Sequence, residues 1–317
     1  GNVKDESKIF ELTVNGFPAS LSKSNNFETS VYLAEGKNNV YLRAMDEHGN
    51  SVEEKYEVVY APIKKSGQRS SGFDKASDKK IRKGKNYALI MGINNYSDPL
   101  INNLTTPISD AEKLSKILIA NYTFNEGDVK ILKNPSRERI ISELDNINRK
   151  VTDKDNFIIY YAGHGYWESK DEIGYWLPSD SKQQNTANWL RNSTLRDYLR
   201  TIDTKHTLLI ADACFSGGIF KERKSFRKSA KSIKELQELT SRKAMTSGSL
   251  KEVPDKSVFL LYLTKRLKEN THDNISAEEL FNSFNVQVMN NSSNTPLYGD
   301  IKGAGDEGGD FIFVKRK

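Results

Sequence analysis

The stretch DNFIIYYAGHG, residues 155–165, combines a long apolar run with a histidine that stands between two glycines. Residues 157–162 are almost all large and apolar, which is typical of a strand covered on both faces in a parallel sheet. The run ends at Gly163-His164-Gly165, although glycine has no side chain to pack and costs backbone entropy. The glycines therefore indicate a sharp turn or a close backbone approach beside His164, and either suits a functional site.

Strands and helices alternate around this stretch. Apolar runs in NYALIMGINNY (86–96), DVKILKN (128–134) and KHTLLIADACFSGG (205–218) predict three more strands. Helical spacing predicts one helix in SDAEKLSKILIANYTF (109–124) and a second that opens at Asn134-Pro135. This alternation indicates strand–helix–strand units, and hence an α/β fold with a mostly parallel sheet flanked by helices.

The C-terminal part predicts two more helices and a strand. The helices are expected in SVFLLYLTKRLKEN (257–270) and in SAEELFNSFNVQVMN (276–290). Ser276 is expected to cap the second helix, because Glu279 follows it with the spacing of a capping box. GDFIFVKRK (309–317) is the last predicted strand.

Residues 8–60 follow another pattern and predict a separate domain. Short strands are interrupted by turn signals at Asn15-Gly16, Glu35-Gly36 and 47–50, so His48 is expected in a turn. The run from EGKNNVYLRAMDEHGN (35–50) onward resembles the immunoglobulin-like modules of exported bacterial proteins. Residues 61–84 have the Lys, Ser and Gly content of a linker. We therefore predict an immunoglobulin-like β-sandwich at 1–60, a basic linker at 61–84 and an α/β domain at 85–317.

Composition narrows the classes of function. Hydrophobic residues make up 36% of the chain and charged residues 28%, and no apolar run approaches the length of a membrane span. The formal net charge is +6, and much of the positive charge lies in residues 62–85 and 221–243. These segments lack the interleaved aromatic residues that stack on bases, so we expect solvated segments and no nucleic-acid partner.

Cys214 is the only cysteine in the chain. A disulfide within the chain and a thiolate zinc cage are therefore excluded. A lone thiol is usually a small buried hydrophobic group, and it becomes a candidate nucleophile only if a histidine can reach it. Cys214 and His164 both follow apolar strands, and neighbouring parallel strands lie about 5 Å apart with ligands bound beyond their carboxyl ends. The sequence therefore predicts a Cys–His pair at this edge of the sheet.

Two motifs carry a family resemblance. YYAGHG (160–165) and DACFSGG (212–218) resemble the His and Cys motifs of caspase-like cysteine peptidases, the clan of caspases, metacaspases and bacterial orthocaspases. His164 precedes Cys214 by 50 residues, close to the caspase spacing. Other segments within 85–317 resemble the family's first strand and helix, the region after its cysteine and its C-terminal edge: residues 87–114, 241–249, 257–267 and 295–314.

The resemblance implies a role for each motif residue. His164 would be the general base and Cys214 the nucleophile of a cysteine endopeptidase. The backbone N–H groups of Gly165 and Cys214 would form the oxyanion hole, and a glycine beside the base leaves its amide uncovered. The Gly-His-Gly sequence then places the base next to an oxyanion donor.

The sequence departs from caspases at Asp212, where their signature has glutamine. A carboxylate in the primary pocket repels an acidic P1 side chain and attracts Arg or Lys. Metacaspases are similar in using this Asp together with one in the first helix, which corresponds to Asp110. We therefore expect cleavage after Arg or Lys. The alternative for Asp110 is that it only caps its helix.

No metal site is predicted. Many metacaspases need calcium held by clustered aspartates, so calcium activation is compatible with the resemblance. The acids that follow His164 lack the spacing of a calcium loop, which favours a solvated loop; they are Glu168, Asp171, Glu172 and Asp180.

The segment 219–244 follows the nucleophile motif and is rich in Lys, Arg and Ser. A mobile loop is expected there, and caspase-like enzymes similarly mature by cutting after the catalytic cysteine. We therefore predict self-cleavage between Lys221 and Lys243. The alternative is that SIKELQELT (232–240) forms a stable helix that shields the segment, with Ile233, Leu236 and Leu239 as its apolar stripe.

Two rival functions remain open at this point. A catalytically silent scaffold would keep the fold without hydrolysis, although the presence of both His164 and Cys214 disfavours it. A nucleic-acid-binding module would use the basic segments. The immunoglobulin-like module favours export, whereas no signal peptide is visible in the chain, so the compartment is cytoplasmic or exported; the oligomeric state is left undetermined.

Overall fold

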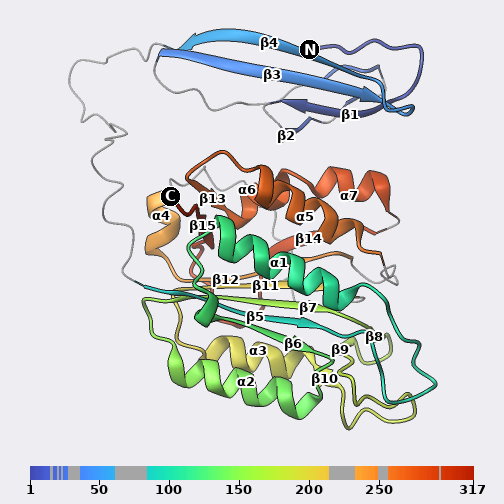
Figure 1. The fold of residues 1–317 in the computed structure, drawn as a ribbon, viewed down its shortest axis with the longest axis vertical. Helices are drawn as coiled ribbons and strands as arrows, with labels where there is room; N and C mark the ends of the chain where they lie inside the picture. Colours follow the sequence, from blue (N-terminus) through green and yellow to red (C-terminus); the bar gives the residue numbers. More distant parts are fainter. Residues whose placement is uncertain are drawn as a thin grey trace. The chain divides into compact units, whose positions relative to one another are not determined.

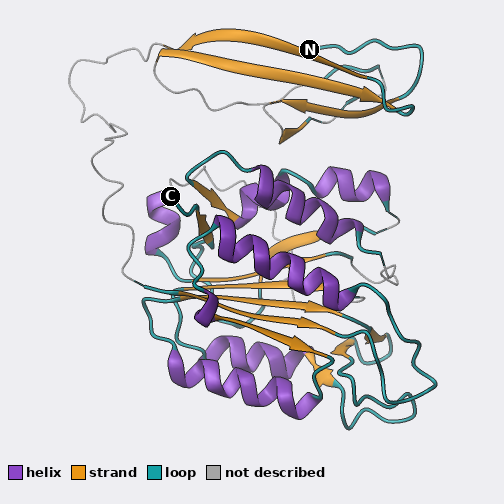
Figure 2. Cartoon of the chain, viewed as in Figure 1, coloured by secondary structure: helices purple, strands orange, loops and turns teal. Residues whose placement is uncertain are grey.

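A computed structural model describes residues 1–14, 17–19, 21–22, 24–27, 36–60, 84–213, 233–248, 256–292 and 294–317 (Figures 1 and 2). The chain divides into two compact units. One comprises Gly1–Arg82 with Asn282–Gln287, and the other comprises Lys83–Phe281 with Val288–Lys317. Most of the predicted linker, 61–83, lies outside the described residues, so its boundaries stay a prediction.

The N-terminal unit contains an antiparallel sheet with the strand order β2-β1-β3-β4. Its small core includes Leu12, Val14 and Val40. The turn between β3 and β4 holds His48, as predicted, and Gly49 there has a φ of +89°. The all-β character predicted for residues 1–60 is confirmed, whereas the second sheet of a sandwich is not found among the residues of this range that the structure describes. The strands are β1 (Ile9–Val14), β2 (Phe17–Pro18), β3 (Gly36–Asp46) and β4 (Ser51–Tyr60).

A six-stranded sheet forms the centre of the larger unit, in the order β14-β12-β11-β7-β5-β6. All neighbouring pairs are parallel except β12 with β14. The four strands predicted from apolar runs are confirmed, with β5, β7 and β11 buried along almost their whole length. The six strands are β5 (Asn86–Gly92), β6 (Val129–Lys133), β7 (Asn156–Ala162), β11 (His206–Asp212), β12 (Ser241–Thr246) and β14 (Leu297–Asp300).

Helices cover both faces of this sheet, so the predicted α/β class is confirmed. Helices α1 (Pro107–Asn121) and α5 (Val258–Glu269) lie on one face, and α2 (Arg137–Lys150) and α3 (Asn192–Thr201) lie on the other (Figure 1). Helix α2 starts two residues later than predicted, at Arg137 instead of Pro135, because Ser136 is its N-cap and accepts a hydrogen bond from the Arg139 N–H at 3.2 Å. None of the helices in the described part of the chain is long and apolar enough to cross a bilayer.

One of the C-terminal predictions was wrong and another is confirmed. The helix predicted at 276–290 is two helices, α6 (Ala277–Asn282) and α7 (Asn285–Asn291), although the Ser276 cap is confirmed by mutual hydrogen bonds with Glu279. The predicted last strand is confirmed as β15 (Ile312–Val314), which pairs with β13 (Asn274–Ser276) outside the main sheet. Asp310 fixes this placement, because its carboxylate accepts the Glu278 N–H at 2.9 Å and the Tyr298 hydroxyl.

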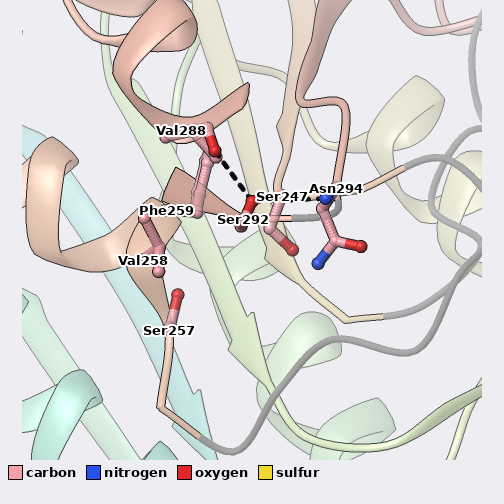
Figure 3. A pocket seen from close by; sticks show the side chains of 7 residues that line it. All are labelled: Ser247, Ser257, Val258, Phe259, Val288, Ser292 and Asn294. Carbon is pink, nitrogen blue, oxygen red and sulfur yellow. Dashed lines mark hydrogen bonds between the residues drawn. The ribbon is translucent and has the colours of Figure 1, made fainter. Parts of the chain in front are cut away.

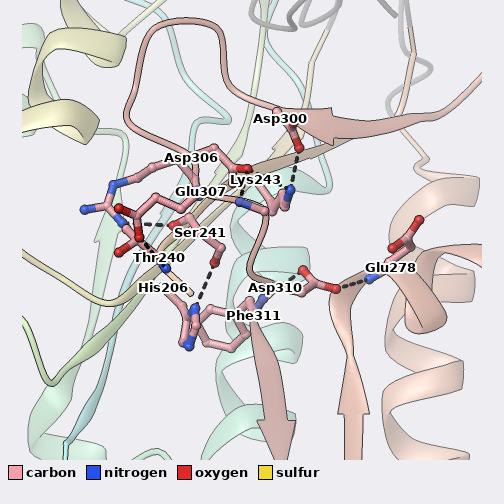
Figure 4. Close-up of polar contacts among 12 residues, drawn as sticks. His206, Thr240, Ser241, Lys243, Glu278, Asp300, Asp306, Glu307, Asp310 and Phe311 are labelled. Atoms are coloured by element: carbon pink, nitrogen blue, oxygen red, sulfur yellow. Dashed lines mark hydrogen bonds and ion pairs between the residues drawn. The ribbon is translucent and has the colours of Figure 1, made fainter. Parts of the chain in front are cut away.

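The end of the predicted mobile loop 219–244 is instead part of the core. Helix α4 (Ile233–Glu238) agrees with the alternative helix, and β12 is buried from end to end. Lys243 forms ion pairs with Asp300 and with Asp306, the second at 3.1 Å (Figure 4). Arg242 donates to three backbone carbonyls, at 2.9–3.1 Å: those of Leu199, Ser241 and Ile202. Because the two buried cations of β12 are paired or hydrogen-bonded, a basic sequence can occupy an inner strand.

A small antiparallel sheet follows His164 directly. It consists of β8 (Gly165–Glu168), β9 (Ile173–Trp176) and β10 (Leu190–Arg191), and β10 leads into α3. The Tyr161 and Trp176 rings stack at 4.3 Å with an interplanar angle of 10°, which joins this sheet to the end of β7. The remaining short element is the 3₁₀ helix η2 (Glu126–Asp128).

Candidate active site

The candidate site lies at the carboxyl ends of β5, β7 and β11. The strand register aligns Gly92, Ala162 and Asp212 across the three strands. His164 is two residues beyond Ala162, and Cys214 is two residues beyond Asp212. The register thus gives both residues the same offset from one row of the sheet, although Cys214 itself lies outside the described residues.

Hydrogen bonds fix the backbone of His164 on both sides. Its N–H donates to the Tyr96 hydroxyl at 2.7 Å. Its carbonyl accepts the Tyr161 hydroxyl at 2.7 Å and the Leu177 N–H at 3.0 Å. The Tyr161 hydroxyl also lies 3.0 Å from the Leu177 carbonyl. The two tyrosines therefore hold the turn between β7 and β8 in place.

The imidazole ring of His164 is half-buried and oriented by two neighbours. Its Nε2 lies 2.8 Å from the carbonyl oxygen of Asn102, and its ring centroid lies 5.0 Å from that of Tyr96. A carbonyl oxygen can only accept, so Nε2 must carry the hydrogen. In the neutral ring, Nδ1 is then the unprotonated nitrogen, which can take a proton from a nucleophile.

Gly163 allows the two tyrosines to approach. A Cβ atom at this position would lie 2.9 Å from the Tyr161 hydroxyl oxygen and 3.0 Å from the Tyr96 hydroxyl oxygen. Real Cβ atoms rarely come this close to another heavy atom, so a side chain here would displace the groups that bind the His164 backbone. This answers why glycine precedes the histidine.

We expect Gly163→Ala to lower kcat/KM by about tenfold or more, because small misplacements of a catalytic group are costly. Overpacking should also reduce the free energy of unfolding by about 1–3 kcal/mol. Gly127→Ala is the matched control, since a Cβ there would meet nothing within 4 Å. Steady-state kinetics and denaturant unfolding of both variants test this, and wild-type kinetics for Gly163→Ala would contradict the positioning role.

The N–H of Gly165 points away from the small sheet. In an antiparallel ladder, hydrogen-bonded and non-hydrogen-bonded pairs alternate. His164 and Leu177 are joined by a hydrogen bond, so the next pair, Gly165 with Trp176, is the non-bonded one. The Gly165 amide is therefore directed away from β9, as a donor to an oxyanion must be.

Asp212 is a buried carboxyl, only 5% exposed, at the end of β11. Burial raises its pKa to about 6, while the Ser257 and Ser247 hydroxyls beside it lower the pKa and the charge of Asp110 raises it. Its Oδ1 atom has no hydrogen-bond partner among the residues that the structure describes. Asp212 is therefore an acceptor without a compensating cation in the described part of the chain.

Asp110 faces the same region from α1. It lies in the first turn of the helix, while the N-cap is Thr106, so the alternative that Asp110 merely caps the helix is wrong. The buried Tyr160 hydroxyl has a pKa well above its usual value because of burial and the charges of Asp212 and Asp110. The two carboxylates thus act on one shared region, and they create a negative potential there.

A small hollow of about 10 Å³ lies close to the two serines that neighbour Asp212, and Figure 3 shows the side chains that line it. Ser247 and Ser257, which flank the Asp212 carboxyl, both line it, and so does Asn294. Several other buried polar atoms nearby have no partner among the described residues: Tyr160 Oη, Thr246 Oγ1 and Asn294 Oδ1. The sequence did not single out these residues, nor Tyr96 and Asn102, because they occur in no recognisable motif.

The acidic residues after His164 are dispersed in the structure. Asp180 accepts the Arg137 N–H at 2.9 Å, and Glu168 accepts the Lys170 N–H at 3.2 Å. In the described part of the chain, no group of three or more His, Cys, Asp or Glu side chains is placed to hold a metal ion.

Comparisons with known proteins identify the family of this chain. The family model of the caspase domain (Peptidase_C14) matches residues 85–302. The chain is similar to the solved structure of protein GSU0716 from Geobacter sulfurreducens, with 17% identity, a TM-score of 0.48 and coverage of 72% of this chain and 99% of that one. It is also similar to caspase-1 from Spodoptera frugiperda, with 15% identity, a TM-score of 0.48 and coverage of 69% and 90%. No curated protein matches the chain. Since the family model spans more than half of the sequence, this protein belongs to the caspase-domain family of cysteine peptidases.

Proposed function

We propose that this protein is a cysteine endopeptidase that cleaves after Arg or Lys, with Cys214 as nucleophile and His164 as general base. The single observation that carries the specificity is the buried Asp212 carboxyl, whose Oδ1 has no partner among the described residues. A cationic P1 side chain brought against this carboxylate would pair with it, and Asp110 would add to the attraction. An acidic P1 side chain would be repelled by both. The hollow beside Ser247 and Ser257, of about 10 Å³, has room for no more than a water molecule and is not itself the P1 pocket.

The reaction follows from the orientation of His164. The Cys214 thiol gives its proton to Nδ1, because Nε2 is bound to the Asn102 carbonyl at 2.8 Å. The thiolate attacks the scissile carbonyl carbon, and the N–H groups of Gly165 and Cys214 bind the resulting oxyanion. The C–N bond then breaks while the imidazolium returns the proton to the leaving amine. Water, deprotonated by His164, hydrolyses the thioester and regenerates the thiol.

A peptide library that varies only P1 tests this function, with Cys214→Ala as the control for contaminating protease. We expect cleavage after Arg and Lys and none after Asp. A preference for Asp or for an apolar P1 residue would refute the pocket assignment. A wild-type protein that neither cleaves the library nor reacts with an Arg-based electrophile would favour the silent scaffold.

Self-processing is a separate prediction of this proposal. Arg242 and Lys243 are buried in β12, and Lys234 lies within α4, so cleavage is expected between Lys221 and Lys231. The two fragments should stay together, because β11 and β12 pair in register from His206–Ser241 to Ala211–Thr246. Mass spectrometry of the incubated protein before and after unfolding measures both properties. The prediction fails if the chain stays intact while peptides are hydrolysed, or if Cys214→Ala is cut identically.

The N-terminal unit should be dispensable for hydrolysis of short peptides. The predicted nucleophile, base and pocket residues all lie in the unit that starts at Lys83. A chain that begins at Lys83 is therefore expected to keep kcat/KM within about threefold of the full chain, since a change of this size is below 1 kcal/mol. The measurement is kinetics on an Arg peptide, with circular dichroism to verify folding. A large loss of activity in a folded truncated chain would assign the N-terminal unit a direct part in catalysis.

A further inference from the structure

A second cavity, of about 250 Å³, lies where β9 and β10 meet the start of α3. We call it the α3 cavity; Glu172 and Gly174 line it from the β9 side, and Arg191, Asn192, Ser193 and Arg196 line it from β10 and α3. It is separate from the candidate active site. Along the β8–β9 ladder, Gly165 beside His164 pairs with Trp176, whereas the cavity lies at the opposite end, where Glu168 pairs with Ile173.

Two arginines give this cavity its charge. Neither Arg191 nor Arg196 forms an ion pair with any described residue. Arg200, on the same helix, does have a carboxylate, Asp197, at 3.9 Å. Arg191 lies over the Tyr175 ring at 5.7 Å, which holds its guanidinium in place. Glu172 is the one acidic residue of the lining, so the two arginines leave an excess of positive charge.

The start of α3 adds neutral donors. The N-cap is Arg191, which makes no side-chain cap hydrogen bond, so the first N–H groups of this ten-residue helix are available at its positive end. Asn192 is only 9% exposed, yet its Nδ2 has no hydrogen-bond partner in the described part of the chain. A buried amide without a partner is costly, and a ligand that accepts hydrogen bonds would remove this cost.

We propose that the α3 cavity binds a phosphate group, as the free ion or as part of a small phosphorylated molecule. Guanidinium forks match phosphate oxygens bidentately, and helix N-termini are suited to anions. The groups that would bind the phosphate are all hydrogen-bond donors of this chain. They are the side chains of Arg191 and Arg196, the Asn192 amide and the first N–H groups of α3. The α3 cavity would bind an anion, whereas Asp212 is expected to bind a cationic P1 side chain. A binding experiment with phosphate therefore distinguishes the two sites.

The position of the α3 cavity also predicts an effect of phosphate on the stability of the small sheet next to His164. A bound phosphate would join the start of β9, β10 and α3, and β9 is hydrogen-bonded to β8, which begins immediately after His164. A ligand that binds only the folded state raises the free energy of unfolding with the logarithm of its concentration above Kd. The small sheet next to His164 should therefore become more stable when phosphate is present.

Calorimetric titration of the full chain with inorganic phosphate and with adenosine monophosphate, in potassium chloride of matched ionic strength, tests the proposal. We expect Arg191→Gln and Arg196→Gln each to weaken binding by about tenfold or more, because a charge-assisted hydrogen bond is lost. Arg200→Gln, on the same helix but outside the cavity, should bind as the wild type does. Tighter binding of adenosine monophosphate would identify an organic phosphate as the ligand, and equal binding the free ion.

Several results would overturn the proposal of a phosphate site. Absence of phosphate-dependent heat and of a thermal shift in the wild type would exclude the site. Equal weakening in Arg200→Gln would show diffuse attraction to a basic protein and not a site. If Arg196→Gln does not fold, Arg196→Lys keeps the charge but loses the fork, and undiminished phosphate binding by that variant would also count against the site. None of these measurements depends on peptide hydrolysis, so they stand apart from the proposed peptidase activity.

Discussion

Replacing Cys214 or His164 with alanine is expected to reduce peptide hydrolysis by about 10⁴-fold or more, as loss of a nucleophile or its base does in other hydrolases. Without Cys214 no thioester can form. Without His164 the thiol, whose ordinary pKa is about 8.5, keeps most of its proton at neutral pH, and the leaving amine has no proton donor. Kinetics with an Arg peptide and labelling by an Arg-based electrophile measure the two losses.

The fold should survive the His164 substitution. The ring contributes one hydrogen bond to the Asn102 carbonyl and a contact with Tyr96, while its backbone bonds to Tyr96 and Tyr161 do not need the side chain. We expect a loss of about 1 kcal/mol in the free energy of unfolding. The exposed His272 provides a matched control, and His272→Ala should keep wild-type activity. Wild-type turnover by purified His164→Ala or Cys214→Ala would refute the assignment.

Asp212→Asn should have the second largest effect, lowering kcat/KM for Arg and Lys peptides by about 10²-fold or more, because one partner of a buried charge pair is lost. Most of the loss should be specific to cationic P1 residues. Asp110→Asn should give a smaller loss, since Asp110 is less buried. The exposed Asp197 serves as the control carboxylate, and Asp197→Asn should leave P1 preference unchanged.

The same substitution is expected to stabilise the fold at neutral pH. The pKa of Asp212 is raised by burial to about 6, so the folded state holds this proton more tightly than the unfolded state, whose carboxyl has a pKa of about 3.9. The carboxyl therefore costs stability as pH rises from about 4 to 6, and the full cost is present above that range. Asparagine carries no charge, so Asp212→Asn should raise the free energy of unfolding at pH 7.5 by up to about 3 kcal/mol and change little at pH 3.5.

Denaturant unfolding at the two pH values separates this expectation from a purely structural role. A variant that is destabilised at pH 7.5 would show that Asp212 holds the fold together, and the pocket role would lose its support. Binding of an Arg peptide to Cys214→Ala should also weaken as pH falls below about 6, because the neutral carboxyl no longer attracts a cation.

The sequence by itself determined the elements whose signal is local. The apolar runs of β5, β7 and β11 identify buried parallel strands, because each is covered on both faces. The Ser276–Glu279 capping box marks the start of α6 through contacts within one turn. The motif residues His164 and Asp212 could be assigned to strand ends for the same reason, since each directly follows or completes an apolar run.

Only the tertiary structure decided the elements that depend on distant partners. Strand β12 carries Arg242 and Lys243, and its polar sequence predicts a loop until Asp300 and Asp306 supply the opposite charge. The same holds around the site, where Tyr96 and Asn102 orient His164 across 68 and 62 residues of sequence, and Ser257 meets Asp212 from the start of α5. Apolar periodicity reports what a segment buries, but hydrogen bonds and ion pairs between remote segments leave no periodic trace in the sequence, so those partners become visible only when the chain is folded.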